Sequence, residues 1–134
     1  MRSIHRQLKK SEWYDYDKDS DPKYMSLGNA GAHKPYFDRY WSSREKDFSD
    51  LMALLVSLRT SQAEIVATLY SAWNDFLLDG RAFTDDDLVH EVLFNWHDKK
   101  QRFSQDKWLS AVSWMREKGL VPTGYGQHTK PGKK

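Results

Sequence analysis

The chain has no cysteine among its 134 residues, so disulfide bonds and cysteine-ligated zinc sites are excluded. It also lacks an apolar run approaching the ~20 residues that a membrane-spanning helix needs. Its first residues, MRSIHRQLKKSEW, are basic but lack the apolar core of a secretory signal. The absence of cysteine excludes a fold held together by disulfide bonds. From these absences together, we expect a cytoplasmic protein.

The motifs of common enzyme classes are missing as well, including the phosphate-binding loop, GxSxG and GxGxxG. Alternating acids resemble a calcium loop at Asp15, Asp17, Asp19 and Asp21. Ser20 and Ser26 stand where that loop needs Gly and Glu. We therefore predict no metal, no cofactor and no enzyme activity. A small metal-dependent nuclease, with acids such as Asp47 and Asp50, is kept as a third hypothesis.

Aromatic and apolar residues are plentiful. Hydrophobic residues make up 39% of the chain, charged residues 30% and aromatic residues 14%, with six tryptophans. Such a composition favours a globular protein whose large side chains fill a compact helical core. Four tryptophans recur at helical spacing among Leu and Val, at Trp73, Trp96, Trp108 and Trp114. We expect them in the core, and the alternative is a platform that stacks bases of single-stranded nucleic acid.

Helix signals recur along the chain. Residues 1–12 could form a short amphipathic helix, with Ile4 and Leu8 four residues apart. Further helices are expected to begin at Ser42, Ser61, Thr84 and Ser104, and to stop at Gly80 and Gly119. The first two of these starts carry the capping-box spacing S-x-x-E, with Glu45 and Glu64. Residues 13–40 hold two of the four prolines and are expected to be irregular.

The predicted fold class is mainly α. We expect a compact helical domain with a winged helix-turn-helix-like C-terminal half and an irregular aromatic N-terminal arm. The expected divisions are an arm at 1–41, a helical winged-helix-like domain at 42–126 and a basic flexible tail at 127–134.

The winged-helix prediction depends on the segment 84–126. It contains two capped helices, a basic connection, HDKKQRFS, and a strand-like GLVP segment. Lys118 and Gly119 followed by Leu120 and Val121 resemble the step from a recognition helix into a wing. Two departures stand against the resemblance. The connection is longer than a standard turn, and little chain is left for a second wing strand.

Positive charge gathers in the same part of the chain. Residues 98–134 hold nine Lys or Arg against three acids, which favours a polyanionic partner. The predicted nucleic-acid-binding residues are Lys99, Lys100, Gln101, Arg102, Gln105, Lys107, Arg116 and Lys118, with further phosphate contacts from Lys130, Lys133 and Lys134. The alternative interpretation is a solvated charged face with a basic tail.

The aromatic residues of the arm lie outside the helical pattern. They are the predicted protein-interface residues, namely Trp13, Tyr14, Tyr16, Tyr36, Phe37, Tyr40 and Trp41. We expect the arm to lie on the chain's own domain or on another chain.

The run from Ser71 to Pro122 resembles small helical, winged-helix-like modules that accompany bacterial restriction and phage-defence machinery. The resemblance implies an accessory subunit that binds DNA or joins a larger nuclease or ATPase. We therefore expect a non-catalytic DNA-binding module, acting as regulator or accessory subunit on duplex DNA. The alternative is a protein-interaction subunit of a larger antiviral defence complex, docking through the aromatic arm.

Overall fold

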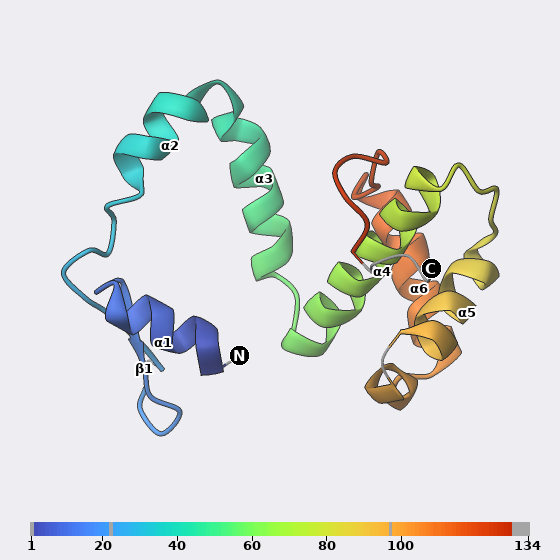
Figure 1. The fold of residues 1–134 in the computed structure, drawn as a ribbon, viewed down its shortest axis with the longest axis horizontal. Helices are drawn as coiled ribbons and strands as arrows, with labels where there is room; N and C mark the ends of the chain where they lie inside the picture. Colours follow the sequence, from blue (N-terminus) through green and yellow to red (C-terminus); the bar gives the residue numbers. More distant parts are fainter. Residues whose placement is uncertain (1, 22, 97, 130–134) are drawn as a thin grey trace. The chain divides into compact units, whose positions relative to one another are not determined.

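The computed structural model describes residues 2–21, 23–96 and 98–129 of the chain (Figure 1). The chain divides into two compact units, residues 1–52 and residues 53–134. Helices predominate in both units, so the mainly α prediction is confirmed. Within the described ranges, every helix is too short or too polar to span a lipid bilayer. The predicted boundaries at 41/42 and 126/127 stay predictions.

The first unit contains short elements. They are α1 (Arg2–Lys10), β1 (Tyr14–Tyr16), β2 (Tyr24–Ser26), α2 (Lys34–Tyr40), the 3-10 helix η1 (Ser42–Arg44) and most of α3 (Glu45–Val56). The strands pair antiparallel, with Tyr14 opposite Ser26 and Tyr16 opposite Tyr24. The helix predicted within residues 1–12 is confirmed as α1.

The prediction that residues 13–40 are irregular is wrong at the hairpin and at α2. The hairpin turn closes because the Asp17 carboxylate accepts the Asp19 N–H at 3.0 Å and the Ser20 hydroxyl donates to the Asp17 carbonyl at 3.2 Å. The acids that resemble a calcium loop thus shape this turn. Pro35 does not break α2, because it stands in the first turn of the helix, where a missing N–H removes no intrahelical bond.

The first unit has no core of its own. Among its residues with described side chains, none is buried. Its aromatic contacts are separate small pairs. His5 stacks on Tyr16 with 4.3 Å between ring centroids, and Phe37 lies 5.1 Å from Phe48. These contacts cover parts of the rings and leave the unit without an enclosed apolar interior.

The second unit is a bundle of three helices, each packed on the other two. They are α4 (Thr60–Leu78), α5 (Asp85–Asn95) and α6 (Gln105–Glu117), with the 3-10 helix η2 (Asp98–Arg102) between α5 and α6. The buried side chains come from all three helices and include Leu69, Leu88 and Trp108. Trp73 is also buried, and Trp96 and Trp114 pack against the core. The prediction that these four tryptophans serve the core is confirmed.

Three helix ends of this bundle follow their sequence signals closely. Thr84 caps α5, because its hydroxyl accepts the Asp87 N–H at 3.2 Å and the Asp87 carboxylate accepts the Thr84 N–H at 2.8 Å. The Thr84 N–H and the Thr84 hydroxyl both donate to this carboxylate and hold the pKa of Asp87 below its ordinary value. Gly80 and Gly119 follow α4 and α6 with φ of 64° and 67°, so both predicted stops are confirmed.

Other capping predictions differ from the structure. Ser42 opens the 3-10 helix η1, and the α-helical part begins at Glu45. Arg59 is the N-cap of α4, where the Gln62 side chain accepts the Arg59 N–H at 2.9 Å. The box predicted from Ser61 and Glu64 is therefore wrong. Ser104 is the N-cap of α6 as expected, although its side chain makes no capping bond.

The segment after α6 does not form the predicted strand. Residues 120–129 contain no strand: the Leu120 N–H donates to the Met115 carbonyl at the end of α6, and part of the later backbone is bonded by side chains of α4. The Asn74 carboxamide accepts the N–H groups of Gly124 and Tyr125 and donates to the Tyr125 carbonyl, at 2.9–3.1 Å. Asp75 accepts the Thr129 N–H, and Asp79 pairs with His128. Residues 127–129, predicted to be flexible, are thus held along α4, whereas residues 130–134 lie outside the described part.

Candidate functional site

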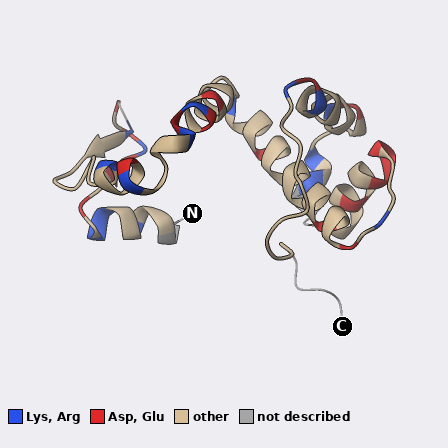
Figure 2. Cartoon of the chain, turned by 90° about the horizontal axis from the view of Figure 1, so that it is seen from above, with Lys and Arg blue, Asp and Glu red and all other residues tan. Residues whose placement is uncertain are grey.

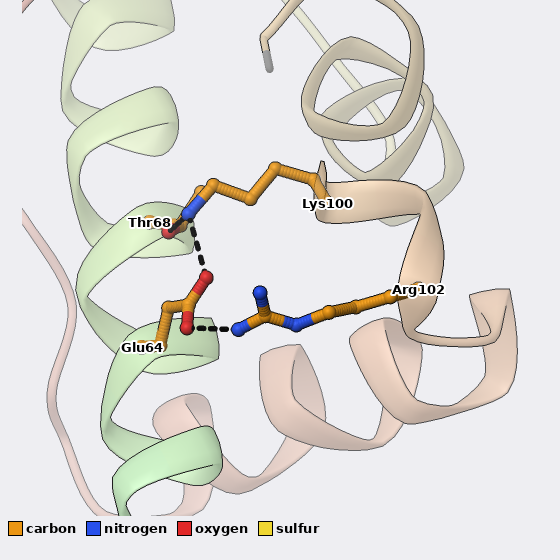
Figure 3. Close-up of polar contacts among 4 residues, drawn as sticks. All are labelled: Glu64, Thr68, Lys100 and Arg102. Carbon is orange, nitrogen blue, oxygen red and sulfur yellow. Dashed lines mark hydrogen bonds and ion pairs between the residues drawn. The ribbon is translucent and has the colours of Figure 1, made fainter. Parts of the chain in front are cut away.

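Glu64 organises the predicted nucleic-acid-binding region (Figure 3). The Lys100 ammonium, from η2, lies 3.1 Å from Glu64 Oε1 on α4 and 3.0 Å from the Thr68 hydroxyl. The Arg102 guanidinium, from the same 3-10 helix, bonds the other carboxylate oxygen. Two of the predicted phosphate-binding cations therefore turn inward and tie η2 to α4.

The electrostatics of this group differ from those of a free basic patch. The hydrogen bond from Lys100, together with the charges of Lys100 and Arg102, holds the pKa of Glu64 below its ordinary value. Only 18% of the Lys100 side chain is exposed. Because Lys100 is largely covered and already paired, it offers little to a phosphate group. Its position explains the fold of the α5–α6 connection better than it explains DNA binding.

Other members of the predicted set also contact the chain itself. The Arg116 guanidinium lies 2.5 Å from the Asp85 carboxylate and 4.5 Å from the centre of the Trp73 ring. Gln101 donates to the Leu93 carbonyl. Gln105 donates to Asp86, and the Lys118 ammonium lies 3.3 Å from Glu117. Acids of α5 and α6 thus offset the positive charge that the sequence places in residues 98–134.

Lys107 differs from these residues, because its side chain is exposed and makes no hydrogen bond or ion pair with the described part of the chain. The Lys99 side chain, like Lys130, Lys133 and Lys134, lies outside the described residues. In the sequence from 53 to 129, eight Lys or Arg stand against ten acids. Figure 2 shows both signs of charge along the helices of the second unit. Of the cluster that the linear sequence suggests, four of the cations with described side chains therefore pair with acids: Lys100, Arg102, Arg116 and Lys118.

The predicted protein-interface residues all lie in the first unit and fall into two groups. Tyr16 stacks on His5, Trp13 packs against His33, and Phe37 contacts Phe48. Tyr36, Tyr40 and Trp41, on α2 and at its end, are the most exposed, at 55–70%. Tyr14 lies in β1 and is partly covered. Large aromatic surface is therefore open on this unit.

Helix α3 continues this apolar surface. Its apolar side chains occur at i, i+3, i+4 and i+7, which places them on one face, and each is at least 36% exposed: Phe48, Leu51, Met52 and Leu55. No residue of α3 is buried. The helix predicted from Ser42 onward is confirmed, with its α-helical part beginning at Glu45. Within the first unit, Phe48, Leu51 and Met52 of this face are 40–50% exposed.

A groove of about 540 Å³ lies between the beginning of α4 and α6. Its apolar lining comes from Leu58, Ile65, Val66, Phe103, Ala111 and Trp114, and its polar lining from Arg59, Ser61, Gln62, Asp106, Lys107 and Ser110. Of these residues, the sequence analysis predicted only Lys107 as a binding residue. The others were missed because they come from two segments that are separated in sequence by about forty residues and carry no shared motif.

The described residues contain no group of three or more His, Asp or Glu side chains placed to hold a metal ion. No protein-family model, curated protein or solved structure matches the chain. What the molecule does must therefore be inferred from its own surfaces.

Proposed function

We propose that the chain is a non-catalytic interaction subunit that docks on a larger protein through the apolar and aromatic surface of residues 13–52. The observation that carries the proposal is the first unit itself, whose described residues expose large aromatic side chains and bury none. We call this surface, formed by Tyr36, Tyr40, Trp41, Phe48, Leu51 and Met52, the arm surface.

The stability of the first unit supports the proposal. Helices α1, α2 and α3 have 9, 7 and 12 residues, and isolated helices shorter than ~12–15 residues are marginal in water. An isolated two-stranded hairpin is marginal too. With no buried side chain, hydrophobic burial contributes little to offset the lost chain entropy. A partner that covers the arm surface would supply the missing burial.

The composition of the arm surface indicates a protein as the partner. Trp, Tyr and Arg are the residues that most often dominate the binding energy of protein interfaces. Trp41 stands beside Tyr40, over whose ring the Arg39 guanidinium lies at 5.3 Å. The apolar face of α3 has the spacing by which an amphipathic helix enters a groove of another protein.

The test uses a photo-crosslinking amino acid in the full chain, expressed in its native host. It replaces Tyr36 in one variant and Tyr125 in the other, since Tyr125 is 88% exposed but belongs to the second unit. We expect one larger protein to be crosslinked from position 36 and not from position 125. The purified partner should then bind the wild-type chain, and Phe48→Ser with Leu51→Ser should weaken binding at least tenfold.

Three results would overturn this function. The first is equal crosslinking from positions 36 and 125, which would mean that the arm surface has no specific partner. The second is unchanged affinity of the purified partner for the double serine variant. The third is a crosslink only to a second copy of the chain.

Duplex DNA binding is the second candidate, favoured by the cations that remain accessible. At both Arg102 and Arg116, 49% of the side chain is exposed, and the Lys107 side chain is unpaired in the described chain. The succession α5, η2 and α6 would serve as the helix-turn-helix of a winged-helix-like module, with residues 120–129 running along α4 in place of a wing.

Fluorescence anisotropy with a random duplex and a matching single strand, at two salt concentrations, tests this candidate. DNA binding predicts affinity for the duplex that falls steeply with salt and weakens in Lys107→Glu. Absence of binding to either nucleic acid at low salt would exclude it and leave the interaction subunit as the sole proposal.

A further inference from the structure

We infer that the groove between α4 and α6 is a second docking site, which receives an apolar, acid-bearing helical segment of a partner protein. This groove belongs entirely to the second unit. It shares no residue with the arm surface, so either proposal can fail without the other.

The lining of the groove suits side-chain anchors. Ile65, Val66 and Trp114 supply apolar walls from both helices, and Ala111 leaves space between them because its side chain is small. The volume of about 540 Å³ falls within the ~300–1,000 Å³ of typical ligand pockets. Anchors at i, i+3 or i+4, and i+7 of an amphipathic helix are a common means of filling an apolar groove.

The rim of the groove has a charge pattern that the rest of the unit lacks. Elsewhere the cations with described side chains are engaged: Lys100, Arg102, Arg116 and Lys118 contact acids, and Arg81 lies over the Phe76 ring. Arg59 and Lys107 make no ion pair and no ring contact within the described chain, and both line the groove. The groove therefore carries two exposed cations that form no ion pair within the described chain.

The helix ends add to this attraction. Arg59 is the N-cap of α4, and Lys107 lies in the first turn of α6, so the positive ends of two helix dipoles face the same region. Asp106, also in the lining, offsets part of this charge and would accept an N–H group or a cation of the occupant. The sum of these charges favours a segment that carries carboxylates beside its apolar anchors.

Three fluorescent peptides of ~14 residues, long enough for four helical turns, probe the groove of the full-length chain by anisotropy. The first has Leu at the anchor positions and Glu beside them. The second replaces each Glu with Lys, and the third replaces each Leu with Ser. We expect the first peptide alone to bind with a dissociation constant below about 1 mM, and more weakly as salt rises.

The variants assign the binding to the groove. Arg59→Glu with Lys107→Glu should weaken binding of the acidic peptide at least tenfold, and Ala111→Phe should fill the space and weaken it comparably. Lys18→Glu with Lys23→Glu changes the net charge equally, at the hairpin turn of the first unit, and should leave the affinity within twofold. Circular dichroism checks folding, and the charge pair remains decisive if the Ala111 variant does not fold.

Equal binding of the acidic and basic peptides would overturn the inference, as would unchanged affinity in the Arg59 and Lys107 double variant. So would the lack of any binding below about 1 mM. Sedimentation supplies a further check: a dimer that Ala111→Phe dissociates would make a second copy the occupant and would refute a separate partner.

Discussion

Glu64→Gln is expected to destabilise the second unit markedly, although Glu64 is not among the predicted binding residues. The carboxylate holds Lys100 at 3.1 Å and bonds Arg102 as well. Gln keeps nearly the same shape and one acceptor oxygen, but it removes the negative charge. Lys100, largely covered by its surroundings, then has only neutral acceptors, the amide oxygen and the Thr68 hydroxyl.

The size of the effect follows from the partial burial of the pair. Exposed ion pairs contribute about 0–1 kcal/mol, whereas breaking a buried pair costs about 3–5 kcal/mol. The exposed fractions of Lys100 and Glu64 are 18% and 32%, between these cases. We therefore expect the free energy of unfolding to fall by about 2 kcal/mol. For a unit of this size the melting temperature would fall by roughly 8–16 °C.

The pH dependence supplies a second test. The folded-state pKa of Glu64 is lowered, so its stabilising contribution is fully present above its unfolded value and is lost as the pH falls through the folded value. Urea unfolding of the wild-type and Glu64→Gln chains, followed by circular dichroism, should differ most near pH 7. The difference should shrink below about pH 4.5, near the ordinary pKa of glutamate.

Glu117→Gln is the matched control, since Glu117 pairs with Lys118 at 3.3 Å on an open surface. It should change the free energy of unfolding by no more than about 0.5 kcal/mol. The reasoning would be refuted if both substitutions had equal effects. It would also be refuted if the Glu64→Gln deficit stayed constant between neutral and acid pH.

Other substitutions test the remaining structure by thermal and urea unfolding. Thr84→Ala should cost about 1 kcal/mol, because α5 loses its cap and half of its capping box; an unchanged melting temperature would contradict that role. Asn74→Ala should cost about 1–3 kcal/mol and speed proteolysis within residues 120–129, because three hydrogen bonds to that segment are lost; protease resistance equal to wild type would show that the segment is held otherwise. Leu88→Ala should cost about 2–5 kcal/mol, since Leu88 is fully buried; a loss below 1 kcal/mol would place Leu88 outside the core.

The sequence predicted the helical bundle well because its signals are local. Apolar periodicity and glycine stops operate within one helix, so the helices of the second unit and their tryptophan core were identified correctly. The hairpin and α2 were missed because both depend on residues that usually indicate a loop. These are the side-chain turn at Asp17 and the proline in the first turn of α2. The predicted strand at Leu120 was wrong: the Leu120 N–H closes the end of α6 on the Met115 carbonyl, and Asn74, fifty residues before Gly124, bonds the segment that follows.

The candidate site was harder to predict because cations that are close together in the sequence need not lie together on the folded surface. Lys100 and Arg102 are neighbours of other cations in the chain, but the fold places both beside Glu64. The groove depends on the meeting of α4 and α6, for which no local pattern exists. By contrast, the aromatic residues of the first unit were identified from their lack of helical spacing, and their role at an interface stays a prediction.

The most direct measurement is hydrogen–deuterium exchange of the purified full chain, without partners, resolved by mass spectrometry. The interaction-subunit account predicts rapid exchange throughout residues 1–52, because none of the described side chains of that unit is buried, and strong protection in α4, α5 and α6. Equal protection in residues 1–52 would contradict the account, because it would mean that the arm is already stably folded without a partner.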